Sequence, residues 1–165
     1  MARSDVVIRR ADVGDAGAMA ALHIDCWDDA YTGLVPQQVL DERRSITDER
    51  VEHWREILAG RHSTLVAECA DGLIGFASAG RGRDNDVDLD LELWALYVRA
   101  SWWGRGVGYA LLEESIGDRA AYLWVLAGNA RAIRFYERQG FRLDGARTEQ
   151  EMGVEARMVR AGTPA

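Results

Sequence analysis

The sequence predicts a mixed α/β (α+β) fold in which strands and helices are interleaved along the chain. Three observations lead to this prediction. Apolar residues recur at helical spacing in the first third of the chain, alternate as in strands through the middle, and switch between the two periods toward the end. Among the strands after the first helices, hairpins come first and strand–helix alternation comes later. The predicted order is β-α-α-β-β-β-α-β-α-β-β.

The first third of the chain predicts one strand and then helices. Residues 6–10 form the strand, and residue types that begin or end helices mark the segments that follow. The expected segments are a helix at 16–27 capped by Asp12 or Asp15, a turn and helix at 28–46 with Gly33 in the turn and Pro36 near the helix start, and a helix that Asp48 opens and Gly60 closes.

The rest of the chain predicts six strands and two helices. Asp71-Gly72 is typical of a β-hairpin turn, and Gly140 is typical of a residue that ends a helix. The expected strands cover 63–69, 73–79, 87–98, 121–126, the segment from Phe141 onward, and 154–160, with a loop at 80–84. The expected helices cover 109–116 and 129–139.

Composition and charge limit the class of protein. With 165 residues, 48% of them hydrophobic and 28% charged, we expect one globular domain covering 1–165. The net charge of −7 argues against binding to DNA or RNA, because nucleic-acid phosphates select cationic surfaces. All 20 basic residues are Arg, which excludes a Schiff-base lysine and a GK[ST] phosphate-binding loop.

Targeting and metal-binding patterns are also missing from the sequence. There is no apolar run long enough for a membrane span and no signal-peptide pattern, so we expect a cytoplasmic protein that does not bind membranes. The histidines and cysteines have no metal-ligand spacing, so no metal site is expected.

A glycine-rich turn, Trp103-Gly104-Arg105-Gly106-Val107-Gly108, separates a predicted strand from a predicted helix. Glycines allow the backbone to approach a ligand closely, and a helix N-terminus presents unpaired N–H groups at the positive end of its dipole. This combination suits a pyrophosphate group, and a tight turn without a ligand is the alternative. The pattern is not a dinucleotide fingerprint, because Tyr109 stands where GxGxxG requires its third glycine.

A second pattern follows the next predicted strand. Asn129 opens a helix, and Tyr136 lies seven residues further on, so the two side chains share one helix face. A phenol in this position can donate a proton to a thiolate, because the ordinary pKa values of a thiol and a phenol are about 8.5 and about 10. The alternative is that Tyr136 is an aromatic residue of the core.

Together the two patterns resemble the motifs of the GCN5-related N-acetyltransferase (GNAT) superfamily. The segment LYVRASWWGRGVGYALL is similar to its acetyl-CoA motif, [Q/R]-x-x-G-x-[G/A], and LWVLAGNARAIRFYERQGF is similar to its second signature. The resemblance extends from about Val6 to about Asp144. It implies a twisted mixed sheet with helices on both faces, splayed open between its fourth and fifth strands, with acetyl-CoA in the opening.

The resemblance also implies roles for individual residues. The strand that pairs with the pantetheine arm is matched by Leu96, Tyr97 and Val98, and the pyrophosphate loop by Gly104, Arg105, Gly106, Val107, Gly108 and Tyr109. Asn129 matches a residue that contacts the cofactor, and Tyr136 matches the general acid that protonates the departing CoA thiolate. Trp103 departs from the pattern, because Gln or Arg is usual there, and Arg105 is the candidate to supply the lost phosphate contact.

Acidic residues occupy every second position before the glycine-rich turn, at Asp84, Asp86, Asp88, Asp90 and Glu92. In an extended strand all five side chains would share one face. For the first three, a solvated strand face is the favoured interpretation.

Glu92 lies furthest into the predicted strand, on the face that also carries Leu96 and Val98. Its register relative to Trp103 resembles that of the general base in the histone-acetylating branch of the superfamily. Glu92 is therefore a candidate base that takes the proton of the amine nucleophile. The alternative is a chain of waters without a single base.

The segment 26–36 resembles a pattern seen in many bacterial members of the superfamily, in which it covers the acceptor pocket. Trp27 and Tyr31 are four residues apart and share a helix face, so they are candidates for an aromatic wall of that pocket. Asp28 and Asp29 either attract a cation there or face solvent.

The resemblance implies an enzyme that moves acetyl from acetyl-CoA to a primary amine. The acids and the net charge favour a cationic small molecule, similar to a polyamine or an aminoglycoside, as the acceptor. The alternatives are a protein N-terminus or lysine side chain as acceptor, or a CoA-binding sensor with little catalysis. A homodimer is the commonest closed assembly and the prior expectation for the oligomeric state.

Overall fold

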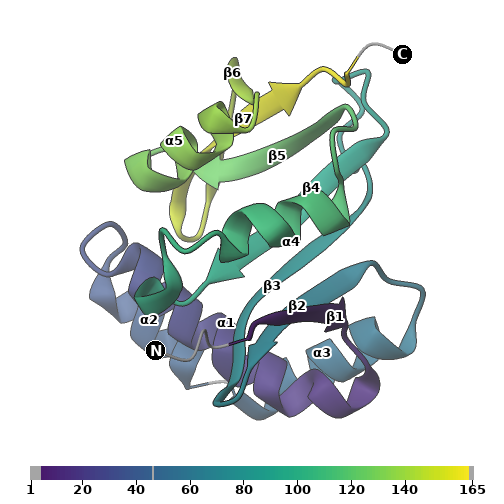
Figure 1. Ribbon diagram of the computed structural model, residues 1–165. Helices are drawn as coiled ribbons and strands as arrows, with labels where there is room; N and C mark the ends of the chain where they lie inside the picture. The colour runs from purple at the N-terminus through teal and green to yellow at the C-terminus, as the bar shows by residue number, and fades with distance from the viewer. Residues whose placement is uncertain (1–4, 46, 164–165) are drawn as a thin grey trace.

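The computed structural model describes residues 5–45 and 47–163, and its centre is a seven-stranded sheet with the order β1-β2-β3-β4-β5-β7-β6 (Figure 1). All neighbouring strands are antiparallel except β4 and β5, which run parallel. The strands are β1 (Val7–Arg10), β2 (Thr64–Cys69), β3 (Gly72–Arg81), β4 (Leu91–Val98), β5 (Ala121–Leu126), β6 (Arg142–Gln150) and β7 (Gly153–Arg160).

Helices cover both faces of this sheet, as the sequence predicted. They are α1 (Ala16–Tyr31), α2 (Gln37–Arg44), α3 (Thr47–Ala59), α4 (Val107–Ser115) and α5 (Ala130–Arg138). None of the helices in the described part of the chain is long and apolar enough to cross a membrane.

The alternation of side chains along β3 separates the two layers of the core. Phe76 packs with α1 and α3 on one face, whereas Ala77 packs with α4 on the other. Successive residues of a strand point to opposite faces, so one strand supports both layers. Figure 1 shows α4 crossing the sheet while α1 and α3 lie together. The helix α5 and the start of β6 close the α4 side near β5.

Two predicted boundaries in the middle of the chain are wrong. The strand predicted at 87–98 begins only at Leu91, and the loop predicted at 80–84 begins later because β3 continues through Arg81. Residues 82–90 form the connection between β3 and β4, which we call the acidic loop. The backbone N–H of Gly82 donates to the carbonyl oxygen of Asp90 at 2.7 Å and closes its base.

The acidic loop is held by a buried guanidinium rather than by strand pairing. Arg157 on β7 is 5% exposed and pairs with Asp84 at 2.9 Å, Asp86 at 2.6 Å and Asp144 at 2.7 Å. A buried charge is costly unless it is paired, so the loop folds back to supply two of these carboxylates. The alternating acids therefore do not share one face of a strand.

Smaller differences occur at helix ends. Helix α1 continues past Trp27 to Tyr31, and Asp12 caps the short 3-10 turn before it by accepting from the Gly14 N–H at 2.8 Å. Helix α4 begins at Val107, two residues before the predicted start. The predicted order also has two helices between the first two strands, whereas the structure has three, α1, α2 and α3. The order of the elements from β2 to β7 is as predicted.

Candidate active site

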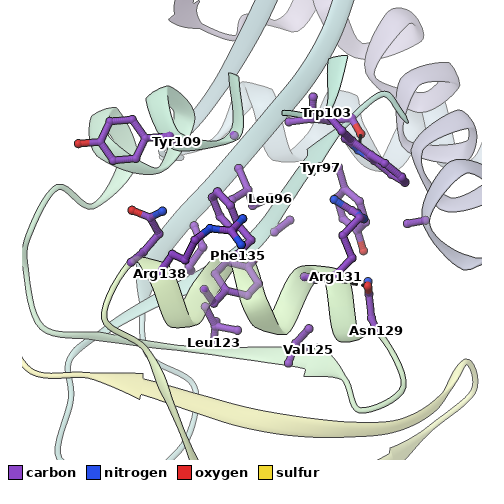
Figure 2. A pocket seen from close by; sticks show the side chains of 18 of the residues that line it. Leu96, Tyr97, Trp103, Tyr109, Leu123, Val125, Asn129, Arg131, Phe135 and Arg138 are labelled. Carbon is purple, nitrogen blue, oxygen red and sulfur yellow. Dashed lines mark hydrogen bonds between the residues drawn. The ribbon is translucent and has the colours of Figure 1, made fainter. Parts of the chain in front are cut away.

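The parallel pair β4–β5 separates after two residue pairs and opens a cleft in the sheet. The two strands pair at two positions, where Glu92 lies opposite Tyr122 and Leu93 lies opposite Leu123. Beyond them lies a cavity of about 500 Å³ between the two strands, which we call the cofactor cleft. Figure 2 shows Leu96, Tyr97 and Trp103 on one side of it, with residues of β5 and α5 opposite. The opening between the fourth and fifth strands, implied by the resemblance, is confirmed.

A β-bulge at Trp94 reverses the alternation of side chains along β4. Ser78 pairs with Ala95 and Ala79 pairs with Leu93, so Trp94 is an extra residue without a partner on β3. Leu93 consequently packs on the α4 face, whereas Ala95 packs on the α1 face. The prediction that Glu92 shares a face with Leu96 and Val98 is therefore wrong, because it assumed regular alternation.

Beyond Leu93, the cleft side of β4 carries backbone groups that pair with no other strand. The Arg99 N–H donates to the Ile74 carbonyl on β3 at 2.9 Å, and the Val98 carbonyl accepts from the Trp103 indole N–H at 2.8 Å, away from β3. The N–H and C=O groups of successive residues in a strand point to opposite sides of that strand. The backbone groups of Leu96 and Val98 therefore point away from β3 and toward the cleft. An extended ligand with amide groups can add to this edge as a strand would.

The glycine-rich turn has the backbone conformation that only glycine adopts easily. Gly104 and Gly106 have φ values of +73° and +86°, and no described atom lies within 4 Å of a Cβ built at either position. Gly106 precedes α4, whose first N–H groups have no partner within the helix. The turn therefore presents an open surface of backbone donors suited to a phosphate group.

A cation from α5 packs against the first residue of the glycine-rich turn. The Arg131 guanidinium lies 3.5 Å from the centroid of the Trp103 ring, and Arg131 and Arg138 both line the cofactor cleft. Arg105, the predicted source of a phosphate contact, lies over Trp102 instead and is not among the lining residues. Trp103 stands where the GNAT pattern usually has Gln or Arg, and its ring packs against the guanidinium of Arg131 instead.

Asn129 and Tyr136 both line the cofactor cleft, so the two residues that the spacing placed on one helix face lie at the same cavity. The Asn129 side chain is buried and caps α5 by accepting from the Ala132 N–H at 3.2 Å. Tyr136 packs edge-on against Phe135 and Phe141. Burial raises the pKa of Tyr136, so its hydroxyl keeps its proton at neutral pH.

A second cavity, of about 310 Å³, adjoins the cofactor cleft. We call it the acceptor cavity, and Tyr31 and Tyr97 line both spaces. The Tyr97 hydroxyl oxygen accepts from the Trp27 indole at 3.2 Å and shares a hydrogen bond of 2.9 Å with the Tyr31 hydroxyl. The predicted aromatic pair Trp27 and Tyr31 therefore lies at the junction of the two cavities.

The remaining predicted acids have partners within the chain. Glu92 is 2% exposed, and its carboxylate accepts from the Arg83 guanidinium at 2.8 and 3.0 Å and from the Tyr122 hydroxyl at 3.1 Å. Asp29 accepts from Arg99 at 2.7 Å, and Asp28 forms an ion pair with Arg44. None of these three acids is among the residues that line either cavity.

The structure thus brings together most of the residues predicted for the cofactor and separates some others. The lining of the cofactor cleft includes Leu96, Tyr97, Val98, Gly104, Gly106, Gly108, Tyr109, Asn129 and Tyr136. Arg105 and Val107 belong to the turn without lining the cleft, and Val107 is a buried core residue.

Sequence reasoning missed five charged residues that line the two cavities: Arg131 and Arg138 in the cofactor cleft, and Arg43, Glu151 and Glu155 in the acceptor cavity. Arg131 follows Asn129 by two positions, so its place in the second motif was an available signal. Arg43 and Glu155 line the acceptor cavity from α2 and β7. Neither lies near a motif in the sequence, so no local signal pointed to them.

Comparisons with known proteins agree with this geometry. Residues 60–143 match the model of the acetyltransferase (GNAT) domain family. The chain is 28% identical over 149 residues to the probable N-acetyltransferase Rv2775 of Mycobacterium tuberculosis, covering 88% of this chain and 84% of that protein. The chain therefore belongs to the GNAT acetyltransferase family and is an enzyme of that class.

Solved structures show the same fold at low sequence identity. The PaiA N-acetyltransferase of Thermoplasma acidophilum, in complex with coenzyme A, superposes with a TM-score of 0.73 at 18% identity, over 96% of this chain and 99% of that one. The putative acetyltransferase yncA of Salmonella typhimurium, with its cofactor acetyl-CoA, gives 0.67 at 21% identity, over 98% and 96%. The splayed sheet is therefore an arrangement shared with other acetyltransferases.

Proposed function

We propose that this enzyme transfers the acetyl group of acetyl-CoA to a primary amine, which attacks directly while both substrates are bound. One observation carries the proposal. The cofactor cleft combines an unpaired strand edge on β4, an open glycine-rich turn at the start of α4, and the hydroxyl of Tyr136. Structural neighbours that contain coenzyme A or acetyl-CoA support the same choice of co-substrate.

The residues of the cleft fit the parts of acetyl-CoA. The backbone groups of Leu96 and the backbone N–H of Val98 are suited to the amides of the pantetheine arm, whereas the Val98 carbonyl is already bonded to Trp103. The glycine-rich turn is suited to the pyrophosphate. Arg131 and Arg138 contribute positive charge near the phosphates. Asn129 is proposed to contact the pantetheine arm while it caps α5.

Acetyl-CoA supplies an activated thioester, and the protein contributes orientation and proton transfer. Backbone N–H groups of β4 polarise the thioester carbonyl as the amine nitrogen forms its bond to the carbonyl carbon. As the carbon–sulfur bond breaks, Tyr136 donates its proton to the leaving sulfur. Its raised pKa keeps the phenol protonated at neutral pH until the thiolate forms, and a proton from solvent restores the phenol after the thiol has left.

The amine must lose a proton, and we propose that water carries it. Glu92 faces the α1 side of the sheet, which is also the side of the acceptor cavity, but its carboxylate is enclosed by Arg83 and Tyr122. Because this carboxylate lines neither cavity, we propose that Glu92 acts as a base only through intervening water. A chain of waters without Glu92 is the alternative.

The proposed acceptor is a cationic small molecule, similar to a polyamine or an aminoglycoside. The experiment is thiol release from acetyl-CoA across polyamines, aminoglycosides, amino acids and short peptides, with the acetylated product confirmed by mass spectrometry. Release that requires a small cationic amine supports the proposal. Release only with peptides indicates a protein acceptor, and tight acetyl-CoA binding without release indicates a sensor.

A further inference from the structure

The acceptor cavity combines hydroxyl-bearing aromatic rings with one carboxylate that has no partner. Tyr31 and Tyr97 form one side, and Glu155 reaches the cavity from β7. Within residues 5–45 and 47–163, no group donates a hydrogen bond to Glu155 or forms an ion pair with it. This carboxylate differs from Glu92 and Asp29, whose oxygens accept hydrogen bonds from arginines of the same chain.

The other charges of the cavity compensate one another. Arg43 pairs with Glu151 at 3.0 Å, and this pair bridges α2 and the β6–β7 hairpin. The guanidiniums of Arg43 and Arg50 also lie 4.6 and 4.5 Å from the centroid of the Trp27 ring. Among the described lining residues, Glu155 is the charged side chain without an ion pair, whereas Arg50, which also has none, lies over Trp27 outside the lining. The end of the cavity that Glu155 lines therefore favours a cation.

The environment of Glu155 also favours a bound cation energetically. Partial burial raises the pKa of Glu155, while the nearby Arg83 lowers it. A half-buried carboxylate without a partner is less stable than one in water, and an ammonium group would restore the lost interactions. Tyr31 lines the same cavity, and its hydroxyl oxygen can accept a further hydrogen bond from that ammonium, whereas the Tyr97 oxygen already accepts from the Trp27 indole and is bonded to Tyr31.

We propose that Glu155 binds a positively charged group of the acceptor other than the amine that reacts. This inference rests on the proposed function. Glu155 lines only the acceptor cavity, whereas the reacting amine must pass Tyr31 and Tyr97 to reach the cofactor cleft. An acceptor bound in this way spans both spaces, so the preferred substrates carry two cationic groups.

The test compares straight-chain α,ω-diamines, from propane to hexane, with the monoamines of the same chain lengths. We expect the wild-type kcat/KM for the best diamine to exceed that of its monoamine by about tenfold or more. Glu155→Gln should remove this preference by raising KM for the diamine, with kcat and the KM for acetyl-CoA little changed. Glu149→Gln, an exposed neutralisation on the same hairpin, is the matched control and should retain the preference.

Two results would overturn the role of Glu155. One is a wild-type enzyme that does not prefer diamines at any chain length, and the other is a preference that survives Glu155→Gln. If none of these amines reacts, calorimetry measures the Kd of the diamines and monoamines for wild type and Glu155→Gln. Tighter binding of diamines that is lost in Glu155→Gln supports the role of Glu155, and equal binding in both proteins overturns it. The proposed function is judged separately, by calorimetric binding of acetyl-CoA and thiol release across the wider amine panel.

Discussion

The cofactor cleft and the acceptor cavity share Tyr31 and Tyr97 but are built in different ways. The cleft is lined mainly by two continuous segments, from β4 through α4 and from β5 through α5, with Ala30 and Tyr31 added from α1. We assign much of its ligand binding to backbone groups of β4 and the glycine-rich turn. The acceptor cavity uses residues from α1, α2, β4, β5 and the β6–β7 hairpin. A ligand held by backbone leaves a short sequence motif, whereas a ligand held by side chains from distant segments does not.

This difference also separates what each region contributes to the reaction. The cofactor cleft holds the strand edge, the glycine-rich turn and Tyr136, which we assign to the thioester. The acceptor cavity holds Glu155 and the aromatic junction, which we assign to the choice of amine. Variants in the cofactor cleft should therefore change kcat or the affinity for acetyl-CoA and leave the KM for the amine nearly unaffected. Variants in the acceptor cavity should do the reverse.

The largest expected effect is on stability, at the buried guanidinium that anchors the acidic loop. Arg157→Met should lower the free energy of unfolding by about 3–5 kcal/mol, because Asp84 and Asp144 lose their buried cation. Denaturant unfolding measures the loss. Arg147→Met, at an exposed position on β6, should change stability by less than about 0.5 kcal/mol. A similar loss in both variants would show that the Arg157 cluster is not the anchor.

The next effect tests the catalytic part of the cofactor cleft. Tyr136→Phe should reduce kcat by about 100-fold or more, because the leaving thiolate loses its proton donor. The Kd for acetyl-CoA should stay within about twofold, since the ring and its contacts with Phe135 and Phe141 remain. Steady-state kinetics and calorimetry measure the two quantities. An unchanged kcat would remove Tyr136 from the mechanism.

A pH-dependent effect is expected beneath the acceptor cavity. His23 packs between Trp27, Phe76 and Tyr97, and burial lowers its pKa to about 3, against 6.5 in the unfolded chain. Between these values the unfolded state binds one more proton than the folded state. The stability contributed by the neutral ring is therefore fully present above pH 6.5 and is lost as the pH falls.

From pH 7 to pH 5 this linkage should lower the free energy of unfolding by about 2 kcal/mol. His23→Phe should lose that part of the pH dependence, because the replacement ring does not titrate. Urea titrations at the two pH values measure the difference between wild type and variant. Equal pH dependence in both proteins would mean that His23 is not the group responsible.

The smallest effect concerns the cation at the glycine-rich turn. Arg131→Met should weaken acetyl-CoA binding by about tenfold, because a charge-assisted contact to a phosphate is lost. KM for the amine should stay nearly constant. Arg105→Met is the comparison, and it should have a smaller effect because Arg105 lies over Trp102 outside the cleft. The opposite ranking in calorimetry would return the phosphate contact to Arg105.

The sequence by itself determined the order of elements, the glycine-rich turn, and the two motifs that place Asn129 and Tyr136. These features depend on local spacing, which hydrophobic periodicity and glycine positions record directly. Only the tertiary structure decided that Trp94 bulges and turns Glu92 to the α1 face, and that Arg157 folds the acidic loop. It also decided that Glu155 lines the same cavity as Tyr31 and Tyr97, because these residues lie far apart in the chain.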